Sequence, residues 1–313
     1  MKQRLLGAIA RGLRAPLRAL AHARDPALPA ARELERQGIV VYQRHYYHPF
    51  VTAADLLHPL GAERELPGIA LDAEAQLAFL AGLSGREEIR EIGQGGTDPS
   101  GYSYAARNYR HGDADTLYAI VRSFRPRRIV EIGAGASTRV IRAALARIRA
   151  EDPGHACRHV CVEPYEQPWL EELDVELLRA RVETLGPDLF RELGAGDILF
   201  IDSSHVVRPQ GDVLFEILRV LPVLAPGVLV HVHDIFTPAD YPAEWVLRRG
   251  LLWNEQYLLE AFLSMNPGYE ILLACNWLAN RHGDRLQALL PGLALAPDAQ
   301  PGAFWIRRVG AGG

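Results

Sequence analysis

The chain has few sulfur-containing residues and no long apolar run. Its 313 residues include three cysteines and two methionines. Cys157, Cys161 and Cys275 form no CxxC pair, which argues against a disulfide framework or a zinc site and favours buried thiols in a reducing compartment. No apolar stretch is as long as a membrane span. We therefore predict a cytoplasmic protein.

The sequence also lacks an overall excess of basic charge. The formal net charge is −4 and the pI is near 6.3. This balance gives no electrostatic reason to expect a nucleic-acid partner. The composition is 49% hydrophobic and 23% charged, which indicates a globular protein with one large domain, alone or with a smaller one.

The first segment, residues 1–24, departs from this average because it holds six Lys or Arg residues and no acid. On a helical wheel, one face carries Leu5, Leu6, Ile9, Leu13, Leu17 and Leu20, and the opposite face carries Arg4, Arg11, Arg14 and Arg18. One hypothesis is a helix lying on the inner, anionic face of a membrane. The alternative is a helix packed on the protein body, and Pro16 argues against a long regular helix.

Residues 25–110 are predicted to form a helical cap with a lid loop. Residues 40–58 are rich in aromatic side chains and histidine, which suits either a substrate wall or an ordinary packed lid. A helix is expected over residues 71–83. Residues 93–104 contain the glycine, serine and proline typical of a loop, either across a binding site or on the surface.

Residues 111–313 alternate between helical and strand-like patterns. Strands are expected near residues 129–132, 159–163, 178–182, 197–202, 227–233, 269–275 and 303–306, and helices over residues 115–124, 139–148 and 212–224. Continuous apolar strands separated by helices indicate a parallel sheet covered on both faces. The predicted fold is therefore α/β and Rossmann-like, with a mostly parallel sheet and a late antiparallel strand.

The most informative stretch is Arg127–Thr138, which predicts a buried strand, a glycine turn and a helix start. Gly133 and Gly135 allow a tight turn and the close approach of a ligand. Ser137 or Thr138 caps the helix that follows. A nucleotide-like ligand binds where such a turn opens a helix at the carboxyl end of a parallel strand.

The glycine spacing argues against a dinucleotide, because Thr138 stands where that fingerprint has its third glycine. S-adenosylmethionine has no phosphate and does not need that glycine. Its ribose needs an acidic partner, and Glu163 directly follows the second predicted strand. The alternative for Glu163 is a solvated loop residue.

The chain resembles the class I S-adenosylmethionine-dependent methyltransferases, and within them the bacterial group called methyltransferase family 24. The matching segments are residues 108–110, 113–114, 127–138, 162–164, 201–205, 227–241, 253–257 and 303–306. The resemblance implies that Glu131, Gly133, Gly135 and Glu163 contact the cofactor. We add Ser137, Thr138 and Asp202 to this predicted cofactor-binding set.

The acceptor is expected beyond the ends of the fourth and fifth predicted strands. Asp202 and His205 follow the fourth strand, and His233 and Asp234 close the fifth. Methyl transfer to a hydroxyl needs positioning and a base, and imidazole suits the latter task. These four residues are the predicted catalytic set. The alternatives are a loop-capping role for Asp202 and a core role for one of the histidines.

The same positions resemble metal-dependent O-methyltransferases of the catechol and macrolide-sugar type. That resemblance implies that Asp202, His233 and Asp234 hold a divalent metal and that His205 stands in the place of a catalytic lysine. His233 departs from the pattern because it replaces an acid. Histidine favours Mn²⁺, Fe²⁺ or Zn²⁺ over Mg²⁺, so both the metal and its identity stay open.

We predict an enzyme that uses S-adenosylmethionine to methylate oxygen on a small-molecule or glycan-like acceptor. Two alternatives are an NAD(P)-type nucleotide-binding oxidoreductase and a non-catalytic binding protein that keeps the fold. Thr138 argues against the first, and the four polar residues at the strand ends argue against the second. The sequence predicts neither the acceptor nor the oligomeric state.

Overall fold

The computed structural model describes residues 9, 12–22, 29–42, 45–95, 100–105, 108–165 and 167–310. The chain divides into two compact units, Met1–Asp55 and Leu56–Gly313. The predicted cap, residues 25–110, is thus divided between them. The reason is that its later apolar side chains, including Leu77, Leu80 and Ile89, belong to the main hydrophobic core.

The first unit contains α2 (Arg14–His22), α3 (Pro29–Arg36) and a short 3₁₀ turn, Ala53–Asp55. Ile9, Leu13 and Leu17 of the predicted apolar face are exposed. Leu5, Leu6, Arg4 and Arg11 lie outside the described residues. In the described part of the chain, every helix is too short or too polar to cross a membrane. Binding of this segment to a membrane surface stays a prediction.

The second unit is built on a seven-stranded sheet with the order β3-β2-β1-β4-β5-β7-β6. The strands are β1 (Arg128–Ile132), β2 (Arg158–Val162), β3 (Glu176–Leu178), β4 (Ile198–Ile201), β5 (Leu229–Val232), β6 (Tyr269–Ala274) and β7 (Phe304–Arg308). All pairings are parallel except those of β7 with β5 and β6. This arrangement confirms the predicted Rossmann-like fold with its late antiparallel strand.

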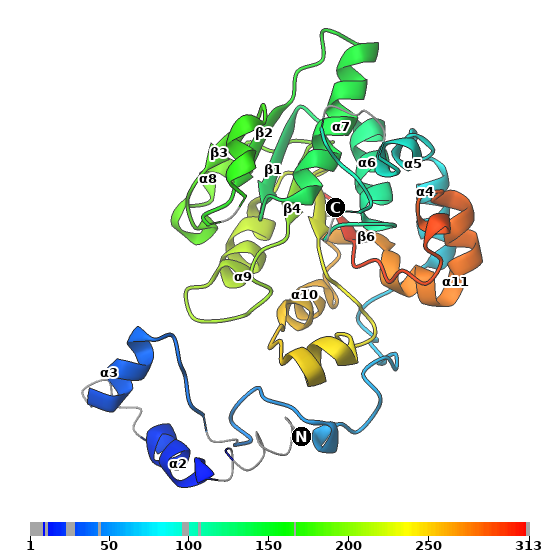
Figure 1. The fold of residues 1–313 in the computed structure, drawn as a ribbon. Coiled ribbons are helices and arrows are strands. Elements are labelled where there is room, and N and C mark those ends of the chain that lie inside the picture. The colour runs from blue at the N-terminus through cyan, green and yellow to red at the C-terminus, as the bar shows by residue number, and fades with distance from the viewer. Residues whose placement is uncertain are drawn as a thin grey trace. The chain divides into compact units, whose positions relative to one another are not determined.

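Helices cover both faces of the sheet. They are α4 (Ala73–Ala81), α5 (Glu88–Gly93), α6 (Asp113–Phe124), α7 (Ala136–Glu151), α8 (Asp188–Arg191), α9 (Asp212–Phe215), α10 (Glu255–Leu263) and α11 (Cys275–Leu289). Figure 1 shows α4, α5, α6 and α11 gathered on one side of the sheet, away from α8 and α9. Alternate strand residues face opposite ways, so Ile129 joins one hydrophobic core and Val130 joins the other.

Two predicted elements differ from the structure. The third strand ends at Leu178 rather than near residue 182, because its partner β2 ends at Val162 and leaves nothing to pair with. The helix predicted over residues 212–224 is α-helical only as far as Phe215. It continues as a π-helix (Glu216–Val220) and a 3₁₀ turn (Leu221–Val223), where Pro222 has no backbone N–H to extend an α-helix.

Candidate functional site

A cavity of about 940 Å³ opens at the carboxyl ends of β1, β2 and β4. Here the strand order reverses around β1, the position at which open α/β sheets bind their ligands. Its wall includes Gly133, Gly135, Ser137, Glu163, Asp202, Ser203, Ser204, His205, Arg208, Tyr109, Trp169 and Trp253. Most of the residues predicted for the cofactor and for catalysis therefore border one space.

The glycine turn after β1 forms one side of the cavity. Gly133 has a left-handed backbone (φ +79°), and its N–H donates to the carbonyl of Val162 at 3.0 Å. Asp202 N donates to the carbonyl of Ile132 at 2.9 Å, so the end of β4 lies directly against this turn. At Gly135 nothing lies within 4 Å of the position of a Cβ. The turn thus presents bare backbone to a ligand.

Glu131 and Thr138 stand behind this wall. Glu131 is fully buried and does not line the cavity. Its carboxylate accepts a hydrogen bond from the Ser137 hydroxyl at 2.6 Å and lies 2.9 Å from Nε2 of His159. The Thr138 hydroxyl accepts from Gly135 N. These two residues support the turn from behind, and direct contact with the cofactor stays a prediction for both.

Cys161 completes the buried group behind the turn. Its Sγ lies 3.5 Å from both Glu131 Oε2 and His159 Nε2. Glu131, His159 and Cys161 have ligand atoms close enough to surround a metal ion. The separations of these three atoms are those of hydrogen bonds within the group and need no ion, although His159 Nδ1 has no hydrogen-bond partner among the described residues.

Glu163 follows β2 and lines the cavity, as its predicted contact with a ribose requires. One carboxylate oxygen accepts a hydrogen bond from Tyr165 N at 2.8 Å, which fixes the side chain at the cavity edge. Its backbone N–H donates to Leu178, the last residue of β3. The ribose contact itself stays a prediction.

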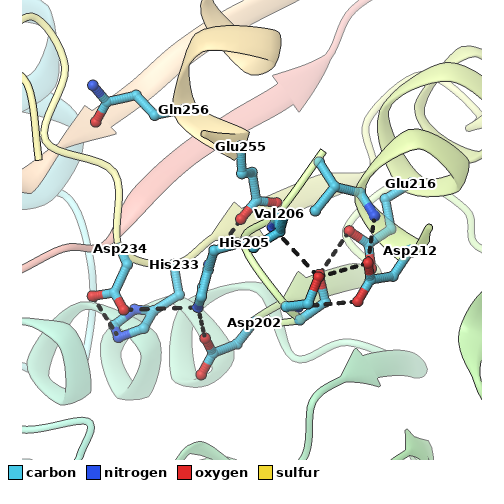
Figure 2. Close-up of polar contacts among 12 residues, drawn as sticks. Asp202, His205, Val206, Asp212, Glu216, His233, Asp234, Glu255 and Gln256 are labelled. Carbon is cyan, nitrogen blue, oxygen red and sulfur yellow. Dashed lines mark hydrogen bonds and ion pairs between the residues drawn. The ribbon is translucent and has the colours of Figure 1, made fainter. Parts of the chain in front are cut away.

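The structure brings the four predicted catalytic residues together (Figure 2). His205 Nε2 lies 3.3 Å from Asp202 Oδ1 and 3.8 Å from Asp234 Oδ2. His233 Nε2 lies 3.6 Å from Asp234 Oδ1. Asp202 and His205 line the cavity, whereas His233 and Asp234 lie behind them and outside the cavity wall.

Mutual charge controls the ionisation of this cluster. Burial works to raise the pKa of Asp202, but the neighbouring His233 and His205 outweigh burial and lower it. Burial works to lower the pKa of His205, but hydrogen bonds to Asp202 and Glu255 hold it well above 6.5. In its neutral form His205 is therefore a stronger base than a free imidazole, and this form is the major one only at a pH above the raised pKa.

Glu255 lies in the segment 253–257, where the sequence leaves open an acceptor-pocket residue or a residue that packs or caps a helix, and it is fully buried at the start of α10. Its Oε2 lies 2.9 Å from Nδ1 of His205, the ring nitrogen that faces away from Asp202. The two residues are 50 positions apart, and a glutamate in a first helical turn is ordinarily interpreted as a helix-stabilising residue. No local sequence signal indicates this contact.

Asp202, His233 and Asp234 also meet the spacing of a metal site, since their ligand atoms lie within 4.8 Å of one another. Two carboxylates and an imidazole suit Mn²⁺, Fe²⁺ or Zn²⁺ better than Mg²⁺. However, the His205 imidazole already approaches both carboxylates and would compete with an ion for them. Metal binding by these three residues stays a prediction.

Residues 130–235 match the model of a family described as a methyltransferase domain. The match covers about a third of the chain and runs from β1 to just beyond β5. It confirms the predicted methyltransferase domain over this part of the chain. None of the curated proteins compared with the chain matches it significantly.

Several solved structures are similar to part of the chain. The methyltransferase PaMTH1 of Podospora anserina, bound to S-adenosylhomocysteine, is 17% identical with a TM-score of 0.38, over 63% of this chain and 78% of its own. MycE from the mycinamycin biosynthetic pathway, in complex with Mg, S-adenosylhomocysteine and mycinamycin VI, is 17% identical with a TM-score of 0.35. That match spans 64% of this chain and half of the MycE chain. The cyclase SpnF is 14% identical with a TM-score of 0.34, over 72% of this chain and 97% of its own.

Proposed function

We infer that this chain, which carries a class I S-adenosylmethionine-dependent methyltransferase domain, methylates a hydroxyl oxygen on a small-molecule or glycan-like acceptor. One observation carries the proposal. We call Asp202, His205, His233 and Asp234 the strand-end cluster. His205, its most basic cavity-lining side chain, borders the same cavity as the glycine turn and Glu163. A cofactor on the turn and an acceptor beside His205 would therefore share one space.

The cofactor side of the cavity suits a sulfonium nucleoside. The backbone at Gly135 leaves room for a ligand to lie flat against the turn. The carboxylate of Glu163 stands at the end of β2, where two ribose hydroxyls can donate to it. S-adenosylmethionine supplies the methyl group on a positively charged sulfur.

The chemistry assigned to the cluster is an in-line displacement assisted by proton removal. The acceptor oxygen forms a bond to the methyl carbon as the carbon–sulfur bond breaks, and the electron pair of that bond stays on sulfur. His205 Nε2 takes the hydroxyl proton. Asp202 and Asp234, at 3.3 and 3.8 Å from Nε2, then stabilise the imidazolium.

The size of the cavity supports a second ligand beside the cofactor. About 940 Å³ lies at the upper end of the range for sites that take one drug-sized molecule. Trp253 lines the cavity, and its ring centroid lies 4.2 Å from that of His205. Such an aromatic wall suits the flat face of a sugar or an aromatic acceptor.

The first test is calorimetry of the purified chain with S-adenosylhomocysteine and, separately, with NAD. We expect saturable binding of the nucleoside and none of the dinucleotide. Preferential NAD binding would point to the oxidoreductase alternative. Methyl transfer from S-adenosylmethionine to a panel of phenols and sugars, with methyl ethers identified by mass spectrometry, then separates an enzyme from a non-catalytic binding protein.

The second test replaces the base. We expect His205→Gln to lower kcat by about 10²–10⁴-fold and to leave the affinity for S-adenosylhomocysteine unchanged. His155→Gln is the matched control, because His155 contacts the carbonyl of Pro126, before the amino end of β1. A His205→Gln variant as active as the wild type would remove His205 from the mechanism.

A further inference from the structure

Glu255 binds the loop that carries His205 through both its backbone and its side chain. His205 has a left-handed backbone (φ +58°), and its carbonyl accepts hydrogen bonds from Asn254 N at 2.9 Å and Glu255 N at 3.2 Å. Asn254 Oδ1 accepts from Val207 N at 2.6 Å. The loop after β4 is thereby fixed to the first turn of α10, and the Glu255 carboxylate is held against the imidazole.

The Glu255 carboxylate has an unusual environment for a residue that only stabilises a helix start. It is fully buried, and its Oε1 has no hydrogen-bond partner among the described residues. Burial raises the pKa of Glu255, although its hydrogen bond to His205 works in the opposite direction. A buried carboxylate is costly unless a donor compensates it, and His205 Nδ1 is the side-chain donor that faces it.

The two ring nitrogens of His205 therefore meet different surroundings (Figure 2). Nδ1 faces Glu255 at 2.9 Å, inside the protein. Nε2 faces Asp202 at the cavity wall. A carboxylate that accepts from Nδ1 keeps the proton on that nitrogen, so the proton that the ring gains or loses is the one on Nε2. Trp253 packs against the same ring and restricts its rotation.

We propose that Glu255 is a positioning residue that holds the His205 ring with Nδ1 protonated and Nε2 directed at the acceptor, forming a glutamate–histidine dyad. This inference rests on the proposed function. It also narrows the acceptor to hydroxyl groups that keep their proton until transfer, such as those of sugars. An acceptor that arrives already ionised gains nothing from a base held in this way.

Methyl transfer assisted by the dyad needs no reactant besides the acceptor and S-adenosylmethionine. The acceptor hydroxyl loses its proton to Nε2 of His205 and gains the methyl carbon from sulfur. The resulting imidazolium donates from Nδ1 to Glu255 and from Nε2 to Asp202. After the methylated product leaves, the Nε2 proton passes to water in the cavity, and the ring returns to its neutral form.

Glu216 provides a matched control for the dyad. It is also fully buried, and its carboxylate accepts from the Ser203 hydroxyl at 3.0 Å. Its other oxygen, like Oε1 of Glu255, has no hydrogen-bond partner in the described part of the chain. The structure shows no hydrogen bond between Glu216 and His205, so Glu216→Gln removes a nearby buried carboxyl group and leaves the dyad intact.

The test compares Glu255→Gln, Glu255→Asp and Glu216→Gln by proton NMR at one fixed pH, with the His205 resonance assigned from its loss in His205→Gln. In the wild type and in Glu216→Gln we expect a far-downfield Nδ1 proton protected from exchange. In Glu255→Gln it should move upfield, because a neutral amide is the weaker acceptor. In Glu255→Asp, whose shorter carboxylate falls short of Nδ1, it should be lost to exchange.

Kinetics use the hydroxylated acceptor found in the methyl-transfer panel. We expect kcat to fall about 100-fold or more in Glu255→Gln, as for a histidine deprived of its orienting carboxylate. KM and the affinity for S-adenosylhomocysteine should stay within about threefold of the wild type. Glu216→Gln should retain its kcat.

The outcomes separate this inference from the proposed function. A Glu255→Gln variant that keeps both kcat and the downfield proton, while His205→Gln is inactive, would overturn the dyad alone. Equal loss of kcat in Glu216→Gln and Glu255→Gln would assign Glu255 a merely structural role. An active His205→Gln would overturn the proposed base and, with it, the dyad.

Discussion

Gly133 lies so close to the end of β4 that a Cβ on it would be 1.8 Å from the carbonyl oxygen of Asp202. That carbonyl belongs to backbone and cannot rotate away. The φ of Gly133 is also +79°, a conformation that L side chains rarely adopt. The cofactor turn and the residue at the proposed chemical site are therefore one packed backbone unit.

We expect Gly133→Ala to lower the free energy of unfolding by about 3 kcal/mol or more, as measured by denaturant titration. Gly135→Ala should keep wild-type stability, since nothing lies within 4 Å of its Cβ position. Its methyl group should instead weaken S-adenosylhomocysteine binding. If Gly135→Ala bound the nucleoside as tightly as the wild type, the turn would not be the cofactor wall.

Removal of the Glu163 carboxylate tests the ribose contact. We expect Glu163→Ala to weaken S-adenosylhomocysteine binding by about 10–100-fold, the loss of a charge-assisted hydrogen bond or two. Glu183→Ala is the control, because Glu183 lines the same cavity with its carboxylate held 2.8 Å from Arg181 Nε. Calorimetry measures the affinity of each variant for S-adenosylhomocysteine. An equal loss of affinity in both variants would indicate that negative charge in the cavity matters, rather than a specific contact between Glu163 and the ribose.

Arg122 joins two acids at the buried side of α6. Its guanidinium donates to Glu88 and to Glu151, with shortest distances of 2.9 and 2.7 Å. Arg122→Met should lower the free energy of unfolding by about 1–3 kcal/mol. This value lies between the costs of breaking an exposed ion pair and a buried ion pair. Arg248→Met, at an exposed pair with Glu244, should have little effect.

Glu88 gives this network a pH dependence of known sign. Burial works to raise the pKa of Glu88, but hydrogen bonds from Arg122 and Tyr118 outweigh it and hold the pKa below 4.5. A pKa that is lower in the folded state than in the unfolded state stabilises the protein above the unfolded value, and this contribution is lost as the pH falls through the folded one. Between pH 6 and pH 3, in denaturant titrations, stability should therefore fall less steeply in Arg122→Met than in the wild type.

Metal removal tests the alternative use of the strand-end acids. Because His205 already stands between Asp202 and Asp234, we expect dialysis against a chelator to leave methyl transfer unchanged and added Mn²⁺ to have no effect. The opposite result would be loss of activity on chelation and its restoration by Mn²⁺, with Asp234→Asn showing neither response. That result would identify Asp202, His233 and Asp234 as ligands of an essential ion.

The sequence by itself determined the sheet, the glycine turn and the polar residues at the strand ends. These features are local: apolar runs form strands buried on both faces, glycine permits the turn, and the residues after parallel strands gather at one edge of the sheet. For the same reason Asp202 and His205 were predicted to lie near His233 and Asp234, and they do.

Only the tertiary structure decided which side chains border the cavity and which stand behind it. Glu131 is held by Ser137 and His159, and Glu255 is carried to His205 by the packing of α10. Such contacts depend on how distant segments pack and on where a buried carboxylate finds its donor. No spacing along the chain encodes them.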